Sequence, residues 1–176
     1  ATSCAPTPRP SYAQERKRRA GTENVPGIVG YGAAVERAVR TMEERTAMER
    51  KLRDHLIDRV LHEVPYTRLN GHRTRRLPNN ANFSFQFVEG ESLLIMLDME
   101  GICGSSGSAC TSGSLDPSHV LLAIGLPHEI AHGSLRLTLS EETTEEELDY
   151  VVEAIKKIVE KLRGMSPLYE DFVRRQ

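Results

Sequence analysis

The chain has 176 residues, of which 39% are hydrophobic and 27% are charged, and its formal net charge is −2. This composition is typical of a globular protein with one domain and a real core, and no apolar run approaches the length of a membrane span, so we expect no membrane contact. Three cysteines, Cys4, Cys103 and Cys110, make no disulfide framework at this size, which favours a reducing compartment and predicts a cytoplasmic protein.

Charge is unevenly distributed along the chain. Residues 1–76 hold 16 Lys and Arg against 9 Asp and Glu, whereas residues 77–176 hold 7 against 16. Such asymmetry can indicate nucleic-acid binding. However, no aromatic residue interleaves with the basic clusters at residues 16–19 and 73–76, so a base-stacking platform is missing. We interpret these charges as solvated helix faces and a polar connector, and expect no nucleic-acid partner.

The N-terminal part divides into a tail and a loop. Residues 1–13 are rich in Ala, Ser, Thr and Pro without helical periodicity, and we expect them to be disordered. Residues 21–26 indicate a loop that enters a helix at Pro26, since proline suits the first helical turn. Thr22 and Asn24 stand in this loop, where a hydroxyl and backbone amides before a helix favour phosphate binding.

A long helical pattern follows the loop. Apolar residues recur at helical spacing from residue 26 to about residue 64, which predicts one long helix or two helices with a break near residues 45–46. A helix of this length usually bridges two domains or packs along another subunit. The residues that set the spacing are Ile28, Tyr31, Val35, Val39, Met42, Leu52, Leu56 and Val60.

Residues 65–176 show the pattern of a small α+β domain. An extended piece at residues 66–69 and two alternating segments, residues 82–87 and 135–140, predict strands, with Phe83, Phe85 and Phe87 on one face of the first. Ile102 and Cys103 indicate a short buried strand in which Cys103 packs.

Helices are predicted between these strands and after them. Residues 92–99 are apolar, Asp116 and Pro117 form a cap and first turn for a helix to Leu122, and a capping box at Thr143 or Thr144 opens a helix to about Leu162. The predicted fold class is α+β, a small antiparallel sheet with helices on one face and a long bridging helix beside it.

Cys110 is the first candidate functional residue. It lies among small residues at positions 105–113, whereas a structural cysteine is usually packed among Leu and Val. A thiol on a mobile loop can be carried to a partner and back, although an incidental thiol on a surface loop is the plain alternative. No charged residue lies within five positions, so activation of the thiolate must come from elsewhere in the fold or from the substrate.

Two further patterns contain residue types that bind ligands or metals. Arg136 lies on the polar face of a leucine-backed strand and is a candidate anchor for a carboxylate, with an ordinary surface ion pair as the alternative. Residues 128–132, HEIAH, match the zinc-peptidase signature. Pro127 and Gly133 bracket them, so the helix is one turn long and too short for a zinc peptidase.

Several motifs fall in one order and carry a family resemblance. Together they resemble the C-terminal half of the class I cysteine desulfurases of the NifS/IscS type, within the class-V aminotransferase family, and cover roughly residues 14–172. The motifs are RAGTENV at 19–25, LPNN at 77–80, VEGES at 88–92, SSGSACTSGS at 105–114, LDPSHV at 115–120, AHGSLR at 131–136 and MSPL at 165–168.

The resemblance implies a fold and a division of the chain. The fold is the small C-terminal domain of a fold-type I transferase that depends on pyridoxal 5′-phosphate. Residues 14–25 would be the remnant of a large-domain cofactor loop, residues 26–64 the bridging helix and residues 65–176 the small domain, while residues 1–13 lie outside the family pattern.

The resemblance also implies an activity. Such enzymes remove sulfur from L-cysteine and leave L-alanine. Cys110 would attack the substrate sulfur and become a persulfide, and would be a candidate transient ligand of an iron–sulfur cluster. Arg136 would bind the substrate carboxylate, and Thr22 would contact the cofactor phosphate of the neighbouring subunit. Zinc has no place in this scheme.

Partners and limits follow from the same resemblance. A homodimer is implied, together with an iron–sulfur scaffold protein or a sulfur carrier that docks near Leu168. The family's cofactor-binding lysine lies in a preceding large domain that is not in this chain, so the pyridoxal phosphate site is incomplete and we expect the chain alone to be inactive. The alternative function is a cofactor-free module that accepts persulfide or binds a scaffold protein, and the third is the zinc peptidase.

Overall fold

The computed structural model describes residues 21–106 and 118–175. The chain forms two compact units, residues 1–42 and 43–176, with their boundary inside helix α1 (Val25–Glu63). Because α1 is one continuous helix, the alternative of two helices with a break near residues 45–46 is wrong. In the described ranges, no helix combines the length and the apolar character needed to cross a membrane.

The first unit contains the beginning of α1. The side-chain Oδ1 of Asn24 accepts a hydrogen bond from Gly27 N at 3.2 Å, and its carbonyl accepts one from Ile28 N at 2.9 Å, so Asn24 closes the first turn. The apolar side chains along this part of the helix are exposed, and α1 is buried only further along. The exposed residues are Val25, Ile28, Val29, Tyr31, Val35, Val39 and Met42.

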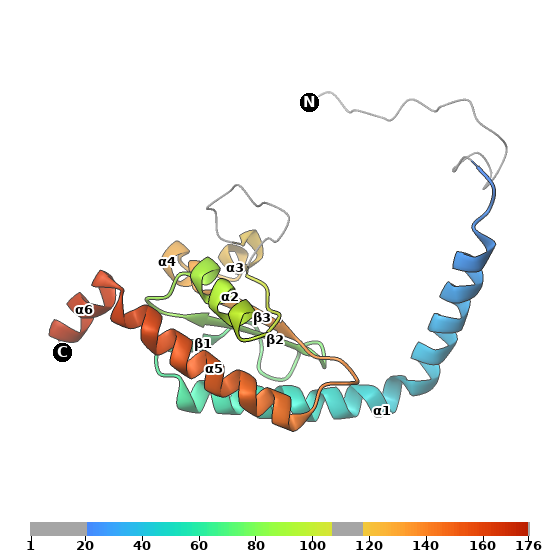
Figure 1. Cartoon of the computed structure of the whole chain (residues 1–176), viewed down its shortest axis with the longest axis horizontal. Coiled ribbons are helices and arrows are strands. Elements are labelled where there is room, and N and C mark those ends of the chain that lie inside the picture. The colour runs from blue at the N-terminus through green and yellow to red at the C-terminus, as the bar shows by residue number, and fades with distance from the viewer. Residues whose placement is uncertain (1–20, 107–117, 176) are drawn as a thin grey trace. The chain divides into compact units, whose positions relative to one another are not determined.

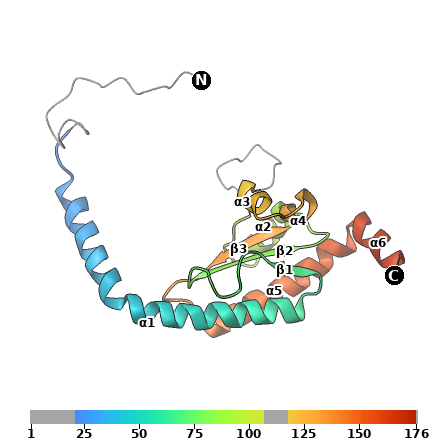
Figure 2. The same cartoon turned by 180° about the vertical axis from the view of Figure 1, so that it is seen from behind.

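The second unit is built around a three-stranded antiparallel sheet in the order β1, β2, β3. The strands are β1 (Thr67–Leu69), β2 (Asn80–Phe85) and β3 (Ser134–Thr138), and Phe83 pairs with Leu135 across β2 and β3. The remaining helices are α2 (Gly90–Met99), α3 (His119–Ala123), α4 (His128–His132), α5 (Glu145–Gly164) and α6 (Pro167–Arg174). Figures 1 and 2 show α5 and the second part of α1 side by side along the sheet.

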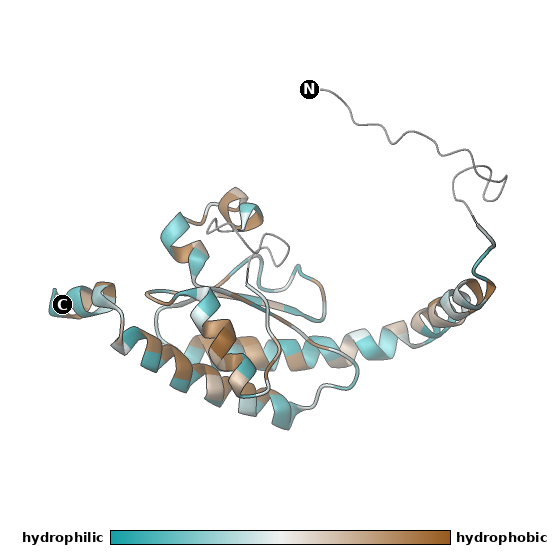
Figure 3. Ribbon diagram, turned by 45° about the horizontal axis from the view of Figure 1, so that its top comes forward, coloured by the Kyte–Doolittle hydropathy of each residue, from teal (hydrophilic) through white to brown (hydrophobic). Residues whose placement is uncertain are grey.

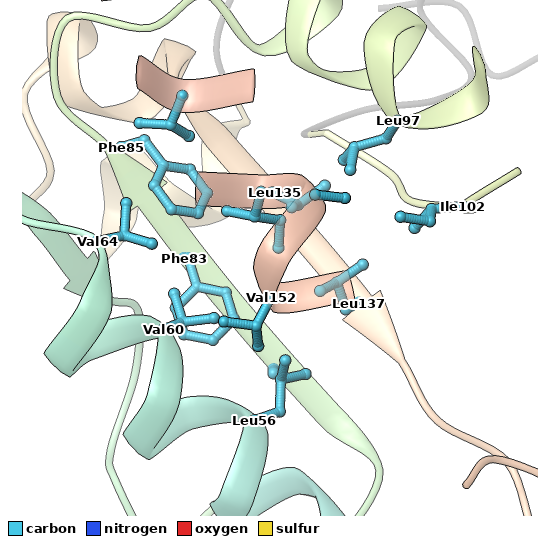
Figure 4. Close-up of a cluster of buried hydrophobic side chains, with 14 of the residues drawn as sticks. Leu56, Val60, Val64, Phe83, Phe85, Leu97, Ile102, Leu135, Leu137 and Val152 are labelled. Carbon is cyan, nitrogen blue, oxygen red and sulfur yellow. The ribbon is translucent and has the colours of Figure 1, made fainter. Parts of the chain in front are cut away.

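The core lies on one face of the sheet. The alternation of β2 and β3 turns Phe83, Phe85 and Leu135 to that face, where each is fully buried. Leu56 and Val60 of α1 and Val152 of α5 gather against these side chains, with Leu97 of α2 nearby (Figure 4). The predicted α+β class, with an antiparallel sheet and helices on one face, is therefore confirmed.

Helix α5 begins at the predicted capping box. The Thr144 Oγ1 accepts a hydrogen bond from Glu147 N at 3.2 Å, and the Glu147 carboxylate accepts one from Thr144 N at 2.9 Å. Thr144, rather than Thr143, is thus the N-cap residue. Hydrophobic and hydrophilic residues alternate along the helix (Figure 3), and its apolar residues complete the core.

The predicted alternation of the first strand fails at Phe87. The strand ends at Phe85, and Phe87 has a positive φ of 65° that turns the chain away from the sheet. Its ring packs instead with Phe172 of α6 at 4.9 Å between centroids and with Tyr169 at 5.5 Å. Helix α6 itself was not expected from the sequence, and it supplies the aromatic partners that draw Phe87 out of the strand.

The prediction of a buried strand at Ile102 and Cys103 is wrong for the strand and for Cys103. Helix α2 ends in a turn at Gly101, whose φ is +73°, and Gly101 N and Ile102 N donate back to Asp98 and Leu97 carbonyls. This turn directs Ile102 into the core, where it is 8% exposed. Cys103 therefore lies exposed on the opposite side of an extended segment.

A network of ion pairs joins α1 to α5. Arg59 contacts Glu63 at 2.6 Å, Asp149 at 2.8 Å and Glu153 at 3.1 Å, and Lys156 contacts Glu63 at 2.8 Å. The hydrogen bonds from Arg59 and Lys156 lower the pKa of Glu63 from its ordinary value of 4.5 to about 2. The charged form of Glu63 therefore stabilises the folded state.

Replacing Glu63 with glutamine tests this linkage. The lowered pKa means that the stabilising contribution of Glu63 is present above pH 4.5 and is lost as the pH falls towards about 2. We expect Glu63→Gln to lower the free energy of unfolding at neutral pH by about 1 kcal/mol or less, and this difference should disappear near pH 2. Urea unfolding across this pH range measures it, with Glu160→Gln as an exposed control. Parallel acid profiles for wild type and Glu63→Gln would contradict the linkage.

A matched pair of leucines tests the position of the core. Leu97 is fully buried on α2, whereas Leu168 on α6 is 68% exposed. We expect Leu97→Ala to reduce the free energy of unfolding by roughly 2–5 kcal/mol, because it removes buried apolar area and leaves a cavity. Leu168→Ala should change it by less than about 0.5 kcal/mol. Equal effects in urea unfolding would show that the core is placed incorrectly.

Candidate functional site

Arg136 lies in the middle of β3, between two buried leucines, and is exposed on the opposite face of the sheet. Its strand neighbours fix this orientation, because Leu135 and Leu137 must point into the core. In the described part of the chain, no acidic side chain forms an ion pair with Arg136. The alternative of an ordinary surface ion pair therefore finds no acidic partner among these residues.

The backbone of Arg136 holds a further segment. Ser105 N donates to the Arg136 carbonyl at 3.1 Å, and Arg136 N donates to the Ser105 carbonyl at 2.6 Å, so Ser105 forms an antiparallel bridge to the outer edge of β3. Residues 107–117 follow directly and contain Cys110 together with Asp116 and Pro117. These three predicted functional and capping residues lie outside the described residues. The bridge fixes where the segment that carries Cys110 begins.

Close backbone approaches surround this bridge, and they occur at glycines. A Cβ on Gly133 would lie 2.2 Å from the Phe85 carbonyl oxygen, and one on Gly90 would lie 2.5 Å from the His132 carbonyl oxygen. A Cβ on Gly104 would lie 2.8 Å from a methyl group of Leu135. Glycine therefore allows the starts of α2 and β3 and the segment before Ser105 to pack without side chains between them.

A polar row crosses the face of the sheet opposite the core, at the level of Arg136. Asn82 of β2 pairs with Arg136 of β3, and Asn70, just after β1, donates from its backbone N to the Asn82 carbonyl at 2.8 Å. The Asn70 Nδ2 donates to Asn82 Oδ1 at 2.6 Å and to Ser84 Oγ at 2.9 Å. The row thus runs from Asn70 through Asn82 and Arg136 to Ser105.

Sequence reasoning missed most of this row. The sequence places Ser105 only in the small-residue segment at positions 105–113, and it assigns no functional role to Asn70. Asn82 carried a usable signal, since its place opposite Phe83 in the alternating segment put it on the polar face. The pairing of Asn82 with Arg136 depends on the register between two segments about fifty residues apart, which periodicity does not reveal.

Helix α4 bears on the zinc alternative. It spans only His128–His132 and ends at Gly133, as the flanking Pro127 and Gly133 predicted. Among the described residues, no group of three or more His, Cys, Asp or Glu is placed to hold a metal ion. Its role is structural, since Ala131 packs with Leu121 and Leu126 in a small apolar cluster beside the end of the sheet.

Glu89 fixes the start of α2 close to the same region. Its carboxylate accepts hydrogen bonds from Glu91 N at 2.8 Å and from Ser92 N at 2.7 Å. Burial alone would raise the pKa of Glu89, but these hydrogen bonds and the nearby His132 outweigh burial and lower the pKa. Glu89 is therefore held as a carboxylate that caps α2 and takes no part in the polar row.

Comparison with known proteins places this chain in a family. Residues 8–151 match the family model described as Aminotransferase class-V. The chain belongs to the class-V aminotransferase family. A cysteine desulfurase IscS from Methanosarcina thermophila is 60% identical over 156 residues, which make up 89% of this chain and 38% of that protein. One from Clostridium botulinum is 56% identical over 163 residues, which make up 92% of this chain and 41% of that protein.

A solved structure agrees with this assignment. The X-ray structure of a NifS-like protein from Rickettsia africae superimposes with a TM-score of 0.75 at 30% sequence identity, covering 85% of this chain and 39% of that one. The resemblance to NifS/IscS-type proteins is therefore confirmed. This chain spans well under half the length of the relatives that it matches.

Thr22, the residue expected to contact a cofactor phosphate, lies in the first unit. It is exposed in the loop before α1, next to Gly21, whose φ of +91° shapes the loop. Asn24 closes the first turn of α1, and the N-terminus of this long helix presents a partial positive charge to an anion. This arrangement fits the phosphate end of pyridoxal phosphate, and the described residues offer nothing comparable for its ring.

The close approach at Gly133 gives a test of the site's framework. Its φ of −82° suits any residue, so an added Cβ acts only through the clash with the Phe85 and Val88 carbonyl oxygens, at 2.2 and 2.7 Å. We expect Gly133→Ala to reduce the free energy of unfolding by roughly 1–3 kcal/mol in urea unfolding. Gly164→Ala, where nothing lies within 4 Å, is the control and should stabilise α5 by up to about 1 kcal/mol. A neutral Gly133→Ala would show that β3 can shift freely.

Proposed function

We propose that this chain is the small-domain part of a pyridoxal phosphate-dependent cysteine desulfurase, which converts L-cysteine to L-alanine and transfers the sulfur as a persulfide. The observation that carries the proposal is the bridge between Ser105 and Arg136. It ties the start of the segment that contains Cys110 to the strand that presents Arg136, which has no acidic partner among the described residues. The relatives named cysteine desulfurase support the reaction assigned to these two residues.

Arg136 would bind the substrate carboxylate. Its planar guanidinium matches the two oxygens of a carboxylate, and the rigid strand beneath it fixes the position of the Cα end of the substrate. The two leucines on either side of Arg136 are buried in the core, so the backbone that carries the guanidinium is held in place. With its carboxylate held by Arg136, the substrate would present its sulfur at a fixed distance from β3.

Cys110 would accept the sulfur. It is the fifth residue after Ser105, so an extended chain allows it to reach at most about 17 Å from the bridge. Its thiolate would attack the substrate sulfur, so that an S–S bond forms as the C–S bond of cysteine breaks. The electron pair of the C–S bond would stay with the carbon skeleton, whose Cβ takes up a proton to give alanine. The persulfide on Cys110 passes to an iron–sulfur scaffold protein or a sulfur carrier, and Cys110 acts as a transient cluster ligand during that transfer.

The cofactor would be held in part by this chain. Thr22 and the N-terminus of α1 take the phosphate, and the bound pyridoxal ring supplies the electron-withdrawing group that makes the C–S bond of cysteine breakable. The remaining cofactor contacts come from the part of the relatives' length that this chain does not span. The active protein is a cytoplasmic homodimer in which Thr22 serves the neighbouring subunit.

Sulfide release from L-cysteine tests the proposal. We expect release with added pyridoxal phosphate when this chain is mixed with the separately expressed large domain of a relative, and none from the chain alone. Cys110→Ser should abolish persulfide formation and sulfide release, while the thermal unfolding midpoint stays unchanged. Cys103→Ser is the matched control, because Cys103 is an exposed free thiol seven positions before Cys110 and should be dispensable.

Other outcomes distinguish the alternatives. If the mixture is inactive but Cys110 becomes persulfidated by a separate sulfur donor, the chain is a cofactor-free sulfur relay and the desulfurase proposal is wrong. If Cys103→Ser and Cys110→Ser lose activity equally, the assignment of Cys110 as the acceptor fails.

A further inference from the structure

The polar row across the sheet contains two groups of hydrogen-bond donors side by side. Asn82 and Arg136 are directly paired residues on neighbouring antiparallel strands, so their side chains emerge from the same face about 5 Å apart at Cβ. Asn82 is half-buried and Arg136 is exposed. Among the described residues, neither the Asn82 Nδ2 nor the Arg136 guanidinium has a hydrogen-bond acceptor on a side chain.

The orientation of the Asn82 amide follows from its neighbour on the other side. Asn70 directs its Nδ2 towards Asn82 Oδ1 at 2.6 Å and Ser84 Oγ at 2.9 Å, so both of its side-chain hydrogens are used. Since Asn70 follows β1 and Arg136 lies on β3, the Oδ1 of Asn82 faces the β1 side. Its Nδ2 therefore faces the β3 side, towards Arg136.

The reverse orientation is less favourable. Rotating both amides would make Asn70 the acceptor and would turn the Asn82 oxygen towards Arg136. Asn70 is only 5% exposed, and the position that its Oδ1 now occupies has no hydrogen-bond partner among the described residues. The rotation would place an NH₂ group with two unsatisfied hydrogens there, which costs more than an unsatisfied carbonyl oxygen. Arg76 also donates to the Asn70 carbonyl and holds that residue in place.

We propose that the Asn82 Nδ2 is a second donor to the substrate carboxylate, beside the guanidinium of Arg136. This inference rests on the proposed function, since it extends the carboxylate site assigned to Arg136. A carboxylate has about four acceptor positions, so a two-pronged arginine leaves positions for a neighbouring amide. Asn82 thereby becomes a substrate-binding residue, and Asn70 is a positioning residue that sets the direction of its amide.

The test uses the full chain labelled with ¹⁵N and two small probes. L-alanine carries the amine and the carboxylate of the proposed product, whereas ethylamine lacks the carboxylate. We expect L-alanine to shift the NMR signals of the Asn82 side-chain NH₂ and the Arg136 Nε–H together with one apparent Kd. Ethylamine should shift neither signal.

Three variants separate the roles. Asn82→Ala removes the donor and should weaken L-alanine binding about tenfold, since a hydrogen bond to a charged group is lost. Asn82→Asp keeps an acceptor for Asn70 but places a carboxylate beside Arg136, so it should weaken binding more than Asn82→Ala does. Thr138→Ala, at the next outward-facing position of β3, is the control and should leave the Kd unchanged.

The outcomes distinguish this inference from the proposed function. If L-alanine shifts the Arg136 signal and its Kd is the same in wild type and Asn82→Ala, Asn82 makes no contact and this inference is overturned while the carboxylate site stands. If L-alanine shifts neither NMR signal, Arg136 does not bind a carboxylate, and both the proposed site and this inference are wrong. The unfolding midpoint of each variant is measured alongside. If Asn82→Ala does not fold, the Asn82 side-chain NH₂ signal of the wild type decides: an L-alanine titration that shifts the Arg136 signal and leaves this NH₂ signal in place overturns the inference.

Discussion

The structure of the second unit depends on the register between β2 and β3. Successive side chains in a strand point to opposite faces, so a slip of one residue would carry Arg136 into the core and Leu135 into solvent. The register is fixed at its end by Gly133, whose backbone packs against the Phe85 and Val88 carbonyls too closely for any side chain. Phe85 N also donates to the Gly133 carbonyl at 2.8 Å. The position of the candidate anion site is therefore a consequence of backbone packing.

Buried arginines hold the irregular segments around the sheet. Arg53, 1% exposed, donates to the Leu77 carbonyl at 3.0 Å and so attaches the connector between β1 and β2 to α1. Arg163 donates to the Gln86 carbonyl at 3.1 Å and the Tyr66 carbonyl at 3.3 Å, where the outer ends of β1 and β2 meet α5. Burial of Arg163 lowers its pKa, but a guanidinium is always charged in proteins, so it keeps its donors. Carbonyls in the connector and at the ends of the strands gain hydrogen-bond donors in this way.

Features of the fold that depend on neighbouring residues were predictable from the sequence. Features that depend on tertiary contacts were not. The capping box at Thr144, the alternation around Leu135 and the single turn at residues 128–132 depend on neighbours within a few positions, and all three were predictable. Phe87 was not, because its aromatic partners on α6 lie more than eighty residues away. Arg136 was recognised as a candidate from its strand face. The bridge between Arg136 and Ser105 and the position of the Asn82 amide were not recognised, because both depend on which segments pair in the sheet.

The two faces of β3 separate stability from binding. Leu135 and Leu137 hold the strand through the core, and the residues of the exposed face are left to meet a ligand. This division explains why Asn82 and Arg136 can lack side-chain acceptors among the described residues without a large cost, since exposed or half-buried donors are hydrated when no ligand is present. In the proposed site, a carboxylate would replace water at these donors. The Asn82 amide would lose little conformational entropy on binding, because the strands and Asn70 fixed it during folding.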